Sequence, residues 1–391
     1  MKRTIIAAAL PLLLFSAGSA NAQYPGSKYY PVLDGTSATF RLETPSSVRG
    51  VQLFGDFLPG VNEYNLGGSV QMLRDSAGVW TYTAEGLAPD FYTYHYVVDG
   101  VRTLDPWNLK LVCNYSEFLN SFLVEGPQSR DLDYADAPRG TLTSIWYDSP
   151  QYGGQRHLNV YLPAGYTPEK TYPVLYMIPG GGDDEDTWTD MGRLPQIMDN
   201  LTSRGEVEEM VVVLFNAMPN QLAAPHIIDP VPGAKSHFEL MGTERGKSGG
   251  EFVNDLLHNI IPLVESRYSV RRDRSGRAVC GVSMGGVYEM YLAEHHPDVF
   301  GWYGFIGTGI MGGTPAQADE ALRPLLRTGY NLLWVGAGSK DMALRSARSL
   351  MEALDRAASP YQYYDCGDGH NWRSWRRDLQ KFAPLLFRSS K

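Results

Sequence analysis

The hydrophobic pattern of this chain changes its period once, across the polar stretch 128–140. Before that stretch, from about residue 37 to 124, short runs alternate apolar and polar residues and are broken by Gly, Pro and Asp, as in antiparallel sandwiches. After it, apolar runs of about five to seven residues alternate with longer amphipathic segments, the pattern of βαβ units on a mainly parallel sheet. The 391 residues are therefore expected to form two domains of different architecture.

The first region is predicted to be all β. Strands are expected at 38–42, 51–54 and 79–83. A hairpin is expected from Phe91 to Val98, turned by Asp99-Gly100 into 101–104, because Asp-Gly supplies the positive φ of a tight type I′ turn. No helix is predicted in this region.

The second region is predicted to be an α/β domain. Buried strands are expected at 174–178, 210–215, 277–282, 302–306 and 332–335, with a late strand at 361–364. Apolar residues recur at helical spacing from Met191 to Leu201 and from Phe252 to Val264, so amphipathic helices are expected to cover the sheet.

The first 22 residues are typical of an export signal. Lys2 and Arg3 form a basic start, 5–15 an apolar core, and Ala20-Asn21-Ala22 a small-residue cleavage site. No later stretch reaches the ~18 apolar residues of a membrane span, and no Cys follows the signal as a lipid anchor. We therefore expect a periplasmic or extracellular protein with no membrane anchor.

These patterns divide the chain into four parts. They are a signal at 1–22, a β-sandwich at 24–126, a linker at 127–140 and an α/β domain at 141–391.

Charge and cysteine content exclude several kinds of site. With 34 Lys and Arg against 43 Asp and Glu, the net charge of −9 offers no basic surface for nucleic acid. Three cysteines, Cys113, Cys280 and Cys366, are too few for a disulfide framework, and their spacing fits no zinc site. They are expected to be buried or free thiols, with a Cys280–Cys366 pair left open.

One segment has the sequence of a nucleophile elbow. Gly281-Val282-Ser283-Met284-Gly285 matches G-x-S-x-G, follows the predicted strand 277–282 and precedes a helical segment at 287–295. Glycines on either side of a serine on so sharp a turn avoid collisions with neighbouring elements and leave its Oγ exposed. Ser283 is therefore the candidate nucleophile.

A serine becomes nucleophilic when a base takes its proton, and in α/β-hydrolases the order along the chain is Ser, acid, His. His370 lies downstream, in a loop that follows the late predicted strand. Asp341 follows the predicted strand 332–335 and is the candidate acid that orients His370. Asp365 and Asp368 are the alternatives, although acids so close to His370 in sequence suit a loop-shaping role.

The tetrahedral intermediate of such a reaction needs two backbone N–H donors for its oxyanion. Met284, the residue after the nucleophile, is one candidate. The other is Gly181 in the glycine-rich loop after the predicted strand 174–178, with Gly182 as second choice.

Three further motifs are assigned no chemistry. The segment 307–312 fits G-x-G-x-x-G, but Thr314-Pro315 interrupts the expected helix and no acid follows about 20 residues later. The segment 242–248 is one residue short of a P-loop. The acidic run 183–186 lacks the spacing of a calcium loop and is predicted to be solvated. We therefore expect neither a cofactor nor a metal.

Further segments resemble the esterase D-like α/β-hydrolases, and within them the family 1 carbohydrate esterases, which include feruloyl and acetylxylan esterases. The likeness covers roughly residues 137–391 and rests, beside the elbow, on RHLNVYLP at 156–163, YPVLY at 172–176, GGGDD at 180–184 and 255–270. One departure is Pro179, where the family usually has His. Proline removes an N–H and fixes φ, which bears on the choice of Gly181 as donor.

The first region resembles the carbohydrate-binding modules of family 48 and related E-set domains. The matching segments are FGDF at 54–57, GVW at 78–80, YTY at 92–94 and DPWN at 105–108. The resemblance implies that an exposed aromatic such as Trp107 stacks on a sugar. The alternative is a structural role in which this domain packs against the catalytic mouth and shapes the acyl pocket.

Together the resemblances imply a serine esterase that removes hydroxycinnamoyl (feruloyl) groups from an acylated polysaccharide or oligosaccharide such as arabinoxylan. Trp188 and Trp372 are expected to flank the aromatic acyl group. Acetylxylan esterase is the second hypothesis, and ferric-siderophore esterase, which shares the two-domain plan, is the third. A triscatecholate favours a basic pocket, so the net charge of −9 argues against that third hypothesis. An inactive carbohydrate-binding protein, favoured only by Pro179, is the non-enzymatic alternative.

Overall fold

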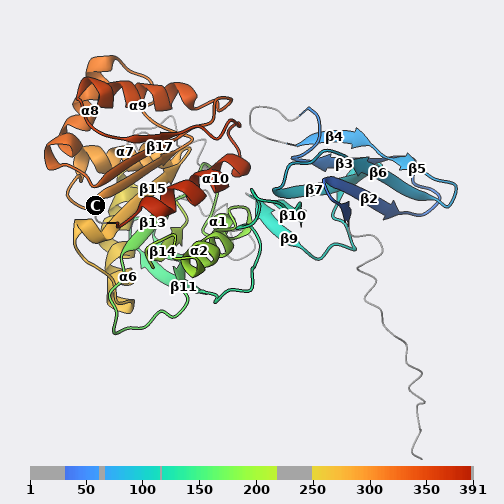
Figure 1. Cartoon of the computed structure of the whole chain (residues 1–391), viewed down its shortest axis with the longest axis horizontal. Helices are drawn as coiled ribbons and strands as arrows, with labels where there is room; N and C mark the ends of the chain where they lie inside the picture. Colours follow the sequence, from blue (N-terminus) through green and yellow to red (C-terminus); the bar gives the residue numbers. More distant parts are fainter. Residues whose placement is uncertain (1–30, 61–66, 115–116, 218–248, 389–391) are drawn as a thin grey trace, which may run out of the picture.

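The computed structural model describes residues 31–60, 67–114, 117–217 and 249–388. They form a small β-sandwich and a larger α/β domain (Figure 1). The expected export signal and the segment 242–248 lie outside the described residues. Within the described ranges, no helix is long and apolar enough to cross a membrane.

The sandwich consists of two antiparallel sheets packed over an aromatic core. One sheet has the strand order β1-β2-β6-β5 and the other β4-β3-β7-β10-β9, with β8 paired to β7. The ring of Phe40 lies 4.9 Å from that of Tyr94 and 5.5 Å from that of Phe122. The strands are β1 (Val32–Asp34), β2 (Ser37–Glu43), β3 (Val51–Gly55), β4 (Gly68–Gln71), β5 (Leu73–Arg74), β6 (Val79–Ala84), β7 (Phe91–Val98), β8 (Val101–Thr103), β9 (Leu111–Asn114) and β10 (Glu117–Leu123).

The predicted hairpin is confirmed. Val98 of β7 pairs with Val101 of β8, and the two residues between them, Asp99 and Gly100, have φ angles of 47° and 86°. Both values lie in the left-handed region that a type I′ turn requires.

The larger domain is built on an eight-stranded sheet in the order β11-β12-β14-β13-β15-β16-β17-β18. The strands predicted from continuous apolar runs are confirmed and run parallel from β14 to β18. The strands are β11 (Thr141–Ser149), β12 (Gly154–Leu162), β13 (Val174–Ile178), β14 (Val211–Phe215), β15 (Arg277–Val282), β16 (Trp302–Ile306), β17 (Leu332–Gly336) and β18 (Gln362–Tyr364).

An antiparallel hairpin, β11–β12, extends one edge of this sheet and was not predicted. The edge strand β11 alternates exposed and buried residues along its second half, so it lacks the continuous apolar run by which the central strands are recognised.

Helices cover both faces of the sheet, because consecutive strand residues point to opposite sides. One face packs against α5, α6, α7, α8 and α9, and the other against α1, α2 and α10. The helices are α1 (Thr187–Asp190), α2 (Leu194–Ser203), α5 (Gly250–Asp255), the π-helical turn η2 (Leu256–Ile260), α6 (Ile261–Arg267), η3 (Arg274–Gly276), α7 (Gly285–His295), α8 (Pro315–Thr328), α9 (Leu344–Arg356), α10 (Trp372–Phe382) and η4 (Ala383–Leu385).

The sandwich lies beside α1 and α10, and the two domains share one apolar core (Figure 1). Phe91, Val112 and Leu119 of the sandwich pack in the same buried cluster as Trp188 and Trp372 of the α/β domain. The N–H of Cys113 donates to Oδ2 of Asp190 at 2.7 Å. The sandwich is therefore docked on the α/β domain rather than tethered to it.

The predicted linker 127–140 is part of this packing. Asp131 and Leu132 are buried within it. The side-chain amide of Asn200, on α2, donates to the carbonyl oxygens of Asp131 and Asp133 at 3.3 and 2.8 Å. The connection between the domains is thus fixed against α2 along much of its length.

Candidate active site

Ser283 stands on the turn between β15 and α7. Its φ is 51°, a left-handed conformation that residues other than glycine rarely adopt. A Cβ on Gly281 would lie 2.6 Å from the backbone carbon of Gly285, and a Cβ on Gly285 would lie 2.4 Å from the carbonyl oxygen of Ile178. Both glycines are therefore required where backbones approach closely, as the elbow motif predicts. The N–H of Ser283 donates to the carbonyl oxygen of Ile306 at 2.9 Å, which ties the turn to β16.

The structure brings the three predicted catalytic side chains into one hydrogen-bonded chain. Oγ of Ser283 lies 2.8 Å from Nε2 of His370, and Nδ1 of His370 lies 2.9 Å from Oδ1 of Asp341. The Asp341 side chain is only 1% exposed. In this order the carboxylate keeps a proton on Nδ1 and leaves Nε2 to accept the proton of Ser283. The arrangement can generate a serine nucleophile and stabilise the imidazolium that results.

The alternative acids, Asp365 and Asp368, make their hydrogen bonds and ion pairs with groups other than the His370 ring. Asp341 follows β17, and its Oδ1 also accepts the N–H of Ala343 at 2.7 Å. Asp365 accepts backbone N–H groups of the neighbouring loops, and Asp368 pairs with Arg373 at 3.3 Å. Both therefore shape the loop that carries His370, whereas Asp341 contacts its ring.

The glycine-rich loop after β13 lies against the nucleophile. Residues 180–183 form a tight turn in which Gly182 has a φ of 93°, a conformation that favours glycine. A Cβ on Gly180 would lie 3.7 Å from Cβ of Ser283. Gly181 lies at the exposed tip of this turn. Its role as an oxyanion donor stays a prediction.

Met284, the other predicted donor, immediately precedes α7, where the first N–H groups of a helix have no partner within the helix. Pro179, which stands where the family has His, is one of the residues by which the loop contacts the elbow. Its carbonyl oxygen would lie 2.7 Å from a Cβ on Gly285. The loop therefore adjoins Ser283 without the histidine that is usual in the family.

The acidic run 183–186 is not a solvated loop, and that prediction is wrong. Its first three carboxylates are at most 7% exposed. Oδ1 of Asp184 accepts the N–H and the hydroxyl of Thr187 at 3.0 and 2.7 Å. Oε1 of Glu185 lies 2.9 Å from Nδ1 of the buried His157. These partners come from α1 and β12, so burial of the run depends on contacts that its own sequence does not reveal.

Asp183 is a buried carboxyl near the triad. A Cβ added to Gly180 would lie 2.8 Å from Oδ2 of Asp183, and the same Cβ would lie 3.7 Å from Cβ of Ser283. Burial raises the pKa of Asp183 to about 7, while the N–H of Gly180 and the charge of His370 lower it in part. Close to neutral pH, this carboxyl is therefore divided between its acid and carboxylate forms.

Glu289 lies fully buried on α7, behind the elbow. Its Oε2 accepts the N–H of Gly281 on β15 at 2.7 Å, and its Oε1 accepts the N–H of Gly304 on β16 at 2.8 Å. Burial raises the pKa of Glu289 well above its ordinary value, although the two backbone N–H groups lower it in part. One side chain thus joins the strand that carries Ser283 to its neighbour. An acid inside the apolar run 287–292 is the sequence signal that was missed.

A cavity of about 610 Å³ opens beside Ser283 and His370. Its wall is formed by the loop after β16 and by residues at the start of α9. Its lining includes both apolar and polar side chains: Met284, Ile310, Met311 and Met342, and Thr308, Arg345, Ser346 and Ser349. The cavity can therefore receive a group that is apolar along its length and carries hydrogen-bonding substituents.

Much of this wall is formed by the segment 307–312. Its G-x-G-x-x-G pattern was rejected as a dinucleotide-binding loop, and the sequence assigned it no other role. Gly307 has a φ of 57°, and a Cβ there would lie 3.2 Å from Nδ1 of His370. The segment follows β16, the strand next to the nucleophile strand. Its position at the carboxyl end of that strand is the signal that points to the site.

Trp188 and Trp372 do not line this cavity, which corrects the expectation that they flank the acyl group. Both are buried, and their rings pack edge to face with centroids 5.2 Å apart. Nε1 of Trp372 donates to Oδ1 of Asn114 at 3.2 Å. The two indoles thus belong to the core shared with the sandwich, because burying large aromatic surfaces there stabilises the domain contact.

The three cysteines are free thiols. Cys280 is buried within β15 and Cys366 is half-buried in the loop before His370, so the pair left open by the sequence is not bonded in this structure. In the described ranges, no group of three or more His, Cys, Asp or Glu side chains is placed to hold a metal.

Comparisons with known proteins agree with this geometry. The Esterase family model matches residues 149–310. The chain is 29% identical over 378 residues to an endo-1,4-beta-xylanase/feruloyl esterase of Xylanibacter ruminicola. That alignment covers 93% of this chain and 46% of the relative, so the chain spans about half the length of that protein.

Solved structures show the same fold. A CE1 ferulic acid esterase from Anaeromyces mucronatus, in complex with ferulic acid, is 25% identical with a TM-score of 0.55, covering 67% of this chain and 96% of that one. The enterobactin esterase of Shigella flexneri is 16% identical with a TM-score of 0.66, covering 90% and 92%. At that identity the likeness concerns the fold alone, and it extends over both domains. With the triad assembled on this fold, the α/β region is thus similar both to the Esterase family model and to a CE1 ferulic acid esterase.

Proposed function

We propose that the protein is an exported feruloyl esterase, a serine carboxylic-ester hydrolase that releases hydroxycinnamoyl groups from a plant polysaccharide such as arabinoxylan. The observation that carries the proposal is the Ser283–His370–Asp341 triad, which opens on a cavity with an apolar wall. The likeness to a feruloyl esterase over both domains supports the substrate class. Export rests on the signal sequence at 1–22.

The chemistry follows from the geometry. As Oγ of Ser283 attacks the ester carbonyl, Nε2 of His370 takes its proton and Asp341 stabilises the imidazolium. The N–H groups of Met284 and Gly181 hold the oxyanion. His370 then returns the proton to the departing sugar oxygen. A water activated by His370 finally cleaves the acyl-enzyme and releases the aromatic acid.

The shape of the cavity supports an aromatic acyl group. Methionine and isoleucine side chains suit the flat ring and the propenoyl chain, and flexible thioethers make favourable contacts with aromatic rings. Arg345, Ser346 and Ser349 offer partners for ring hydroxyl and methoxy groups. An acetyl group would leave most of the 610 Å³ unfilled. A triscatecholate is less well matched, since Arg345 is the sole cation in the described wall apart from the catalytic imidazole.

The test is to incubate the mature protein with arabinoxylan, with the Ser283→Ala variant as control, and to quantify ferulate and acetate in the same sample. Ferulate released by the wild type alone supports the proposal. Acetate alone would assign the protein to the acetylxylan esterases. Release of neither acid would overturn the polysaccharide assignment, and hydrolysis of an enterobactin-type ester would then favour the siderophore alternative. Absence of all hydrolysis would favour the binding protein.

A further inference from the structure

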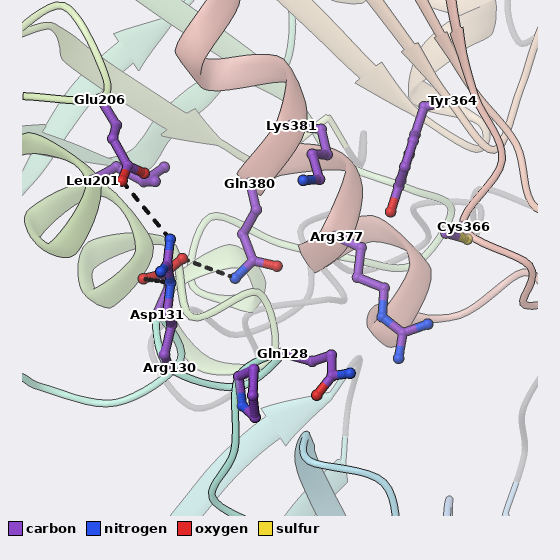
Figure 2. A pocket seen from close by; sticks show the side chains of 11 residues that line it. Gln128, Arg130, Asp131, Leu201, Glu206, Tyr364, Cys366, Arg377, Gln380 and Lys381 are labelled. Carbon is purple, nitrogen blue, oxygen red and sulfur yellow. Dashed lines mark hydrogen bonds and ion pairs between the residues drawn. The ribbon is translucent and has the colours of Figure 1, made fainter. Parts of the chain in front are cut away.

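A second cavity, of about 520 Å³, lies at the junction of the two domains. Its wall combines the interdomain connection, the end of α2 and the loop beyond it, the segment after β18 and the outer face of α10 (Figure 2). Most of the lining side chains are charged or polar, among them Arg130, Asp131, Glu206, Arg377, Gln380 and Lys381. In Figure 2 the side chain of Gln380 extends from α10 toward Asp131, and its Nε2 donates to Oδ2 of that residue at 3.3 Å, which leaves its amide oxygen as an acceptor.

Positive charge exceeds negative charge in this wall, although the chain as a whole carries a net charge of −9. Both carboxylates of the wall already have partners. Asp131 lies 2.8 Å from Arg204 and 3.6 Å from Arg130, and Glu206 lies 2.9 and 3.8 Å from the same two arginines. They therefore do not neutralise the cations on α10.

Those cations are Arg377 and Lys381. Arg377 lies 3.4 Å from Oδ2 of Asp90, a carboxylate that also pairs with Arg373 and Arg376. Lys381 is exposed and makes no ion pair with any residue in the described part of the chain. Arg377 also lies 3.9 Å from Oδ2 of Asp368, so Lys381 is the cation of this helix face that is left for a ligand. A surplus of positive charge in a concave wall concentrates anions, and an ammonium suits a carboxylate.

The remaining polar groups suit a sugar ring. Gln128 and Gln380 present amides, and Tyr364 presents a hydroxyl. The ring of Tyr364 packs against that of Trp334, with the centroids 5.8 Å apart. Amides and hydroxyls both donate and accept hydrogen bonds, as a row of sugar hydroxyls requires. The volume falls in the range of small-molecule sites.

The cavity shares a chain segment with the reaction site. Tyr364 and Cys366 line it, and His370, a few residues further along the same loop, lines the acyl cavity. A polysaccharide whose ester is held at Ser283 has its sugar portion outside the acyl cavity. The junction cavity is the candidate place for that portion, because the segment that lines it leads directly to His370.

We propose that the junction cavity binds a uronic-acid residue of the polysaccharide, whose carboxylate is held by Lys381 and whose hydroxyls meet Gln128, Gln380 and Tyr364. The inference rests on the proposed function for its polysaccharide substrate. It predicts that the enzyme prefers feruloylated chains that carry acidic sugars to neutral ones.

The experiment is calorimetric titration of the mature protein with three probes: a xylo-oligosaccharide carrying one glucuronate, the neutral oligosaccharide of the same length, and inorganic phosphate. We expect the wild type to bind the acidic oligosaccharide about tenfold more tightly than the neutral one, the effect of one charge-assisted hydrogen bond. Lys381→Gln should abolish this preference, and Lys381→Arg should retain it. Lys170→Gln, which removes an exposed lysine paired with Glu209, is the matched control and should bind as the wild type does.

Equal affinity for the acidic and neutral probes would overturn the inference, as would a Lys381→Gln variant that behaves like Lys170→Gln. Binding of phosphate but of neither oligosaccharide would assign the cavity to free anions and would also overturn the inference.

Hydrolysis of methyl ferulate, measured in parallel on the wild type, separates this inference from the proposed function. If methyl ferulate is cleaved and the probes are not distinguished, the cavity assignment alone fails. If the acidic probe binds and no ester is cleaved, the esterase proposal alone fails.

Discussion

Nη2 of Arg376 and Oδ1 of Asp90 lie 2.7 Å apart in a buried ion pair that joins α10 to the sandwich. Arg376 also donates to the carbonyl oxygens of Phe91 and Met191, both at 2.9 Å. Since α10 begins immediately after the loop that carries His370, the sandwich holds the helix that supports the catalytic base. This placement supports the structural role for the first domain that the sequence left as an alternative to sugar binding.

Replacing Asp90 by Ala should destabilise the protein by about 3–5 kcal/mol, because it leaves the buried Arg376 guanidinium without its carboxylate partner. Urea unfolding followed by fluorescence measures the effect. Asp319→Ala, which removes the partner of the exposed Arg356, is the control and should cost no more than about 1 kcal/mol. A loss for Asp90→Ala as small as the control would mean that the domain contact contributes little.

Replacing Asp341 by Asn should lower kcat about 10⁴-fold at neutral pH, because the amide no longer holds His370 in the tautomer that accepts the proton of Ser283. Steady-state kinetics on methyl ferulate measure the loss. Asp368→Asn, which alters the loop without contact to the ring, should change kcat by less than about tenfold. Equal losses in the two variants would show that Asp341 acts only through the loop.

Replacing Glu289 by Gln should lower kcat about tenfold with little change in KM, because the new amide group faces a backbone N–H of Gly281 or Gly304 and the elbow shifts. The unpaired N–H should also cost about 1–3 kcal/mol of stability. Kinetics per folded molecule separate the two effects. Glu294→Gln, half-exposed on the same helix, is the matched control. If kcat per folded molecule stays at the wild-type value, Glu289 serves stability alone.

Asp183 should make stability depend on pH. Its pKa is about 7 in the folded protein and 3.8 as its ordinary value, so the folded state binds the proton more tightly. The free energy of unfolding therefore decreases as the pH rises from about 4 to about 7. Asp183→Asn removes this contribution and should be more stable than the wild type above pH 7 by more than about 1.4 kcal/mol, the equivalent of one pKa unit.

Urea midpoints at several pH values measure this difference, which should vanish below about pH 4. Asp184, whose pKa is raised to about 8, contributes in the same direction, so part of the slope should persist in the variant. A variant whose midpoints parallel those of the wild type at every pH would contradict the assignment to Asp183.

Much of the α/β domain could be predicted because its signals are local. The strand before the elbow, the glycines around Ser283, and the order of Ser283, Asp341 and His370 each follow from short patterns with a single geometric solution. The edge hairpin β11–β12 could not be predicted in this way, since a half-exposed edge strand carries a weak apolar signal.

The role of the segment 307–312 in the cavity beside Ser283 could not be predicted for another reason. The loop 307–312 contains a glycine pattern that fits several structures, and its position beside His370 follows only once β16 is placed next to β15. Glycine patterns describe backbone freedom, whereas the site depends on which strands are neighbours.

The sequence by itself determined the two-domain plan, the central strands and the three residues of the triad, because period, turn chemistry and chain order encode them directly. Only the tertiary structure decided that Trp188 and Trp372 are core residues, that the acidic run 183–186 is buried, and that Asp90 meets Arg376. Burial and ion pairing depend on surfaces that distant segments bring together, and a residue's own sequence neighbourhood does not specify those surfaces.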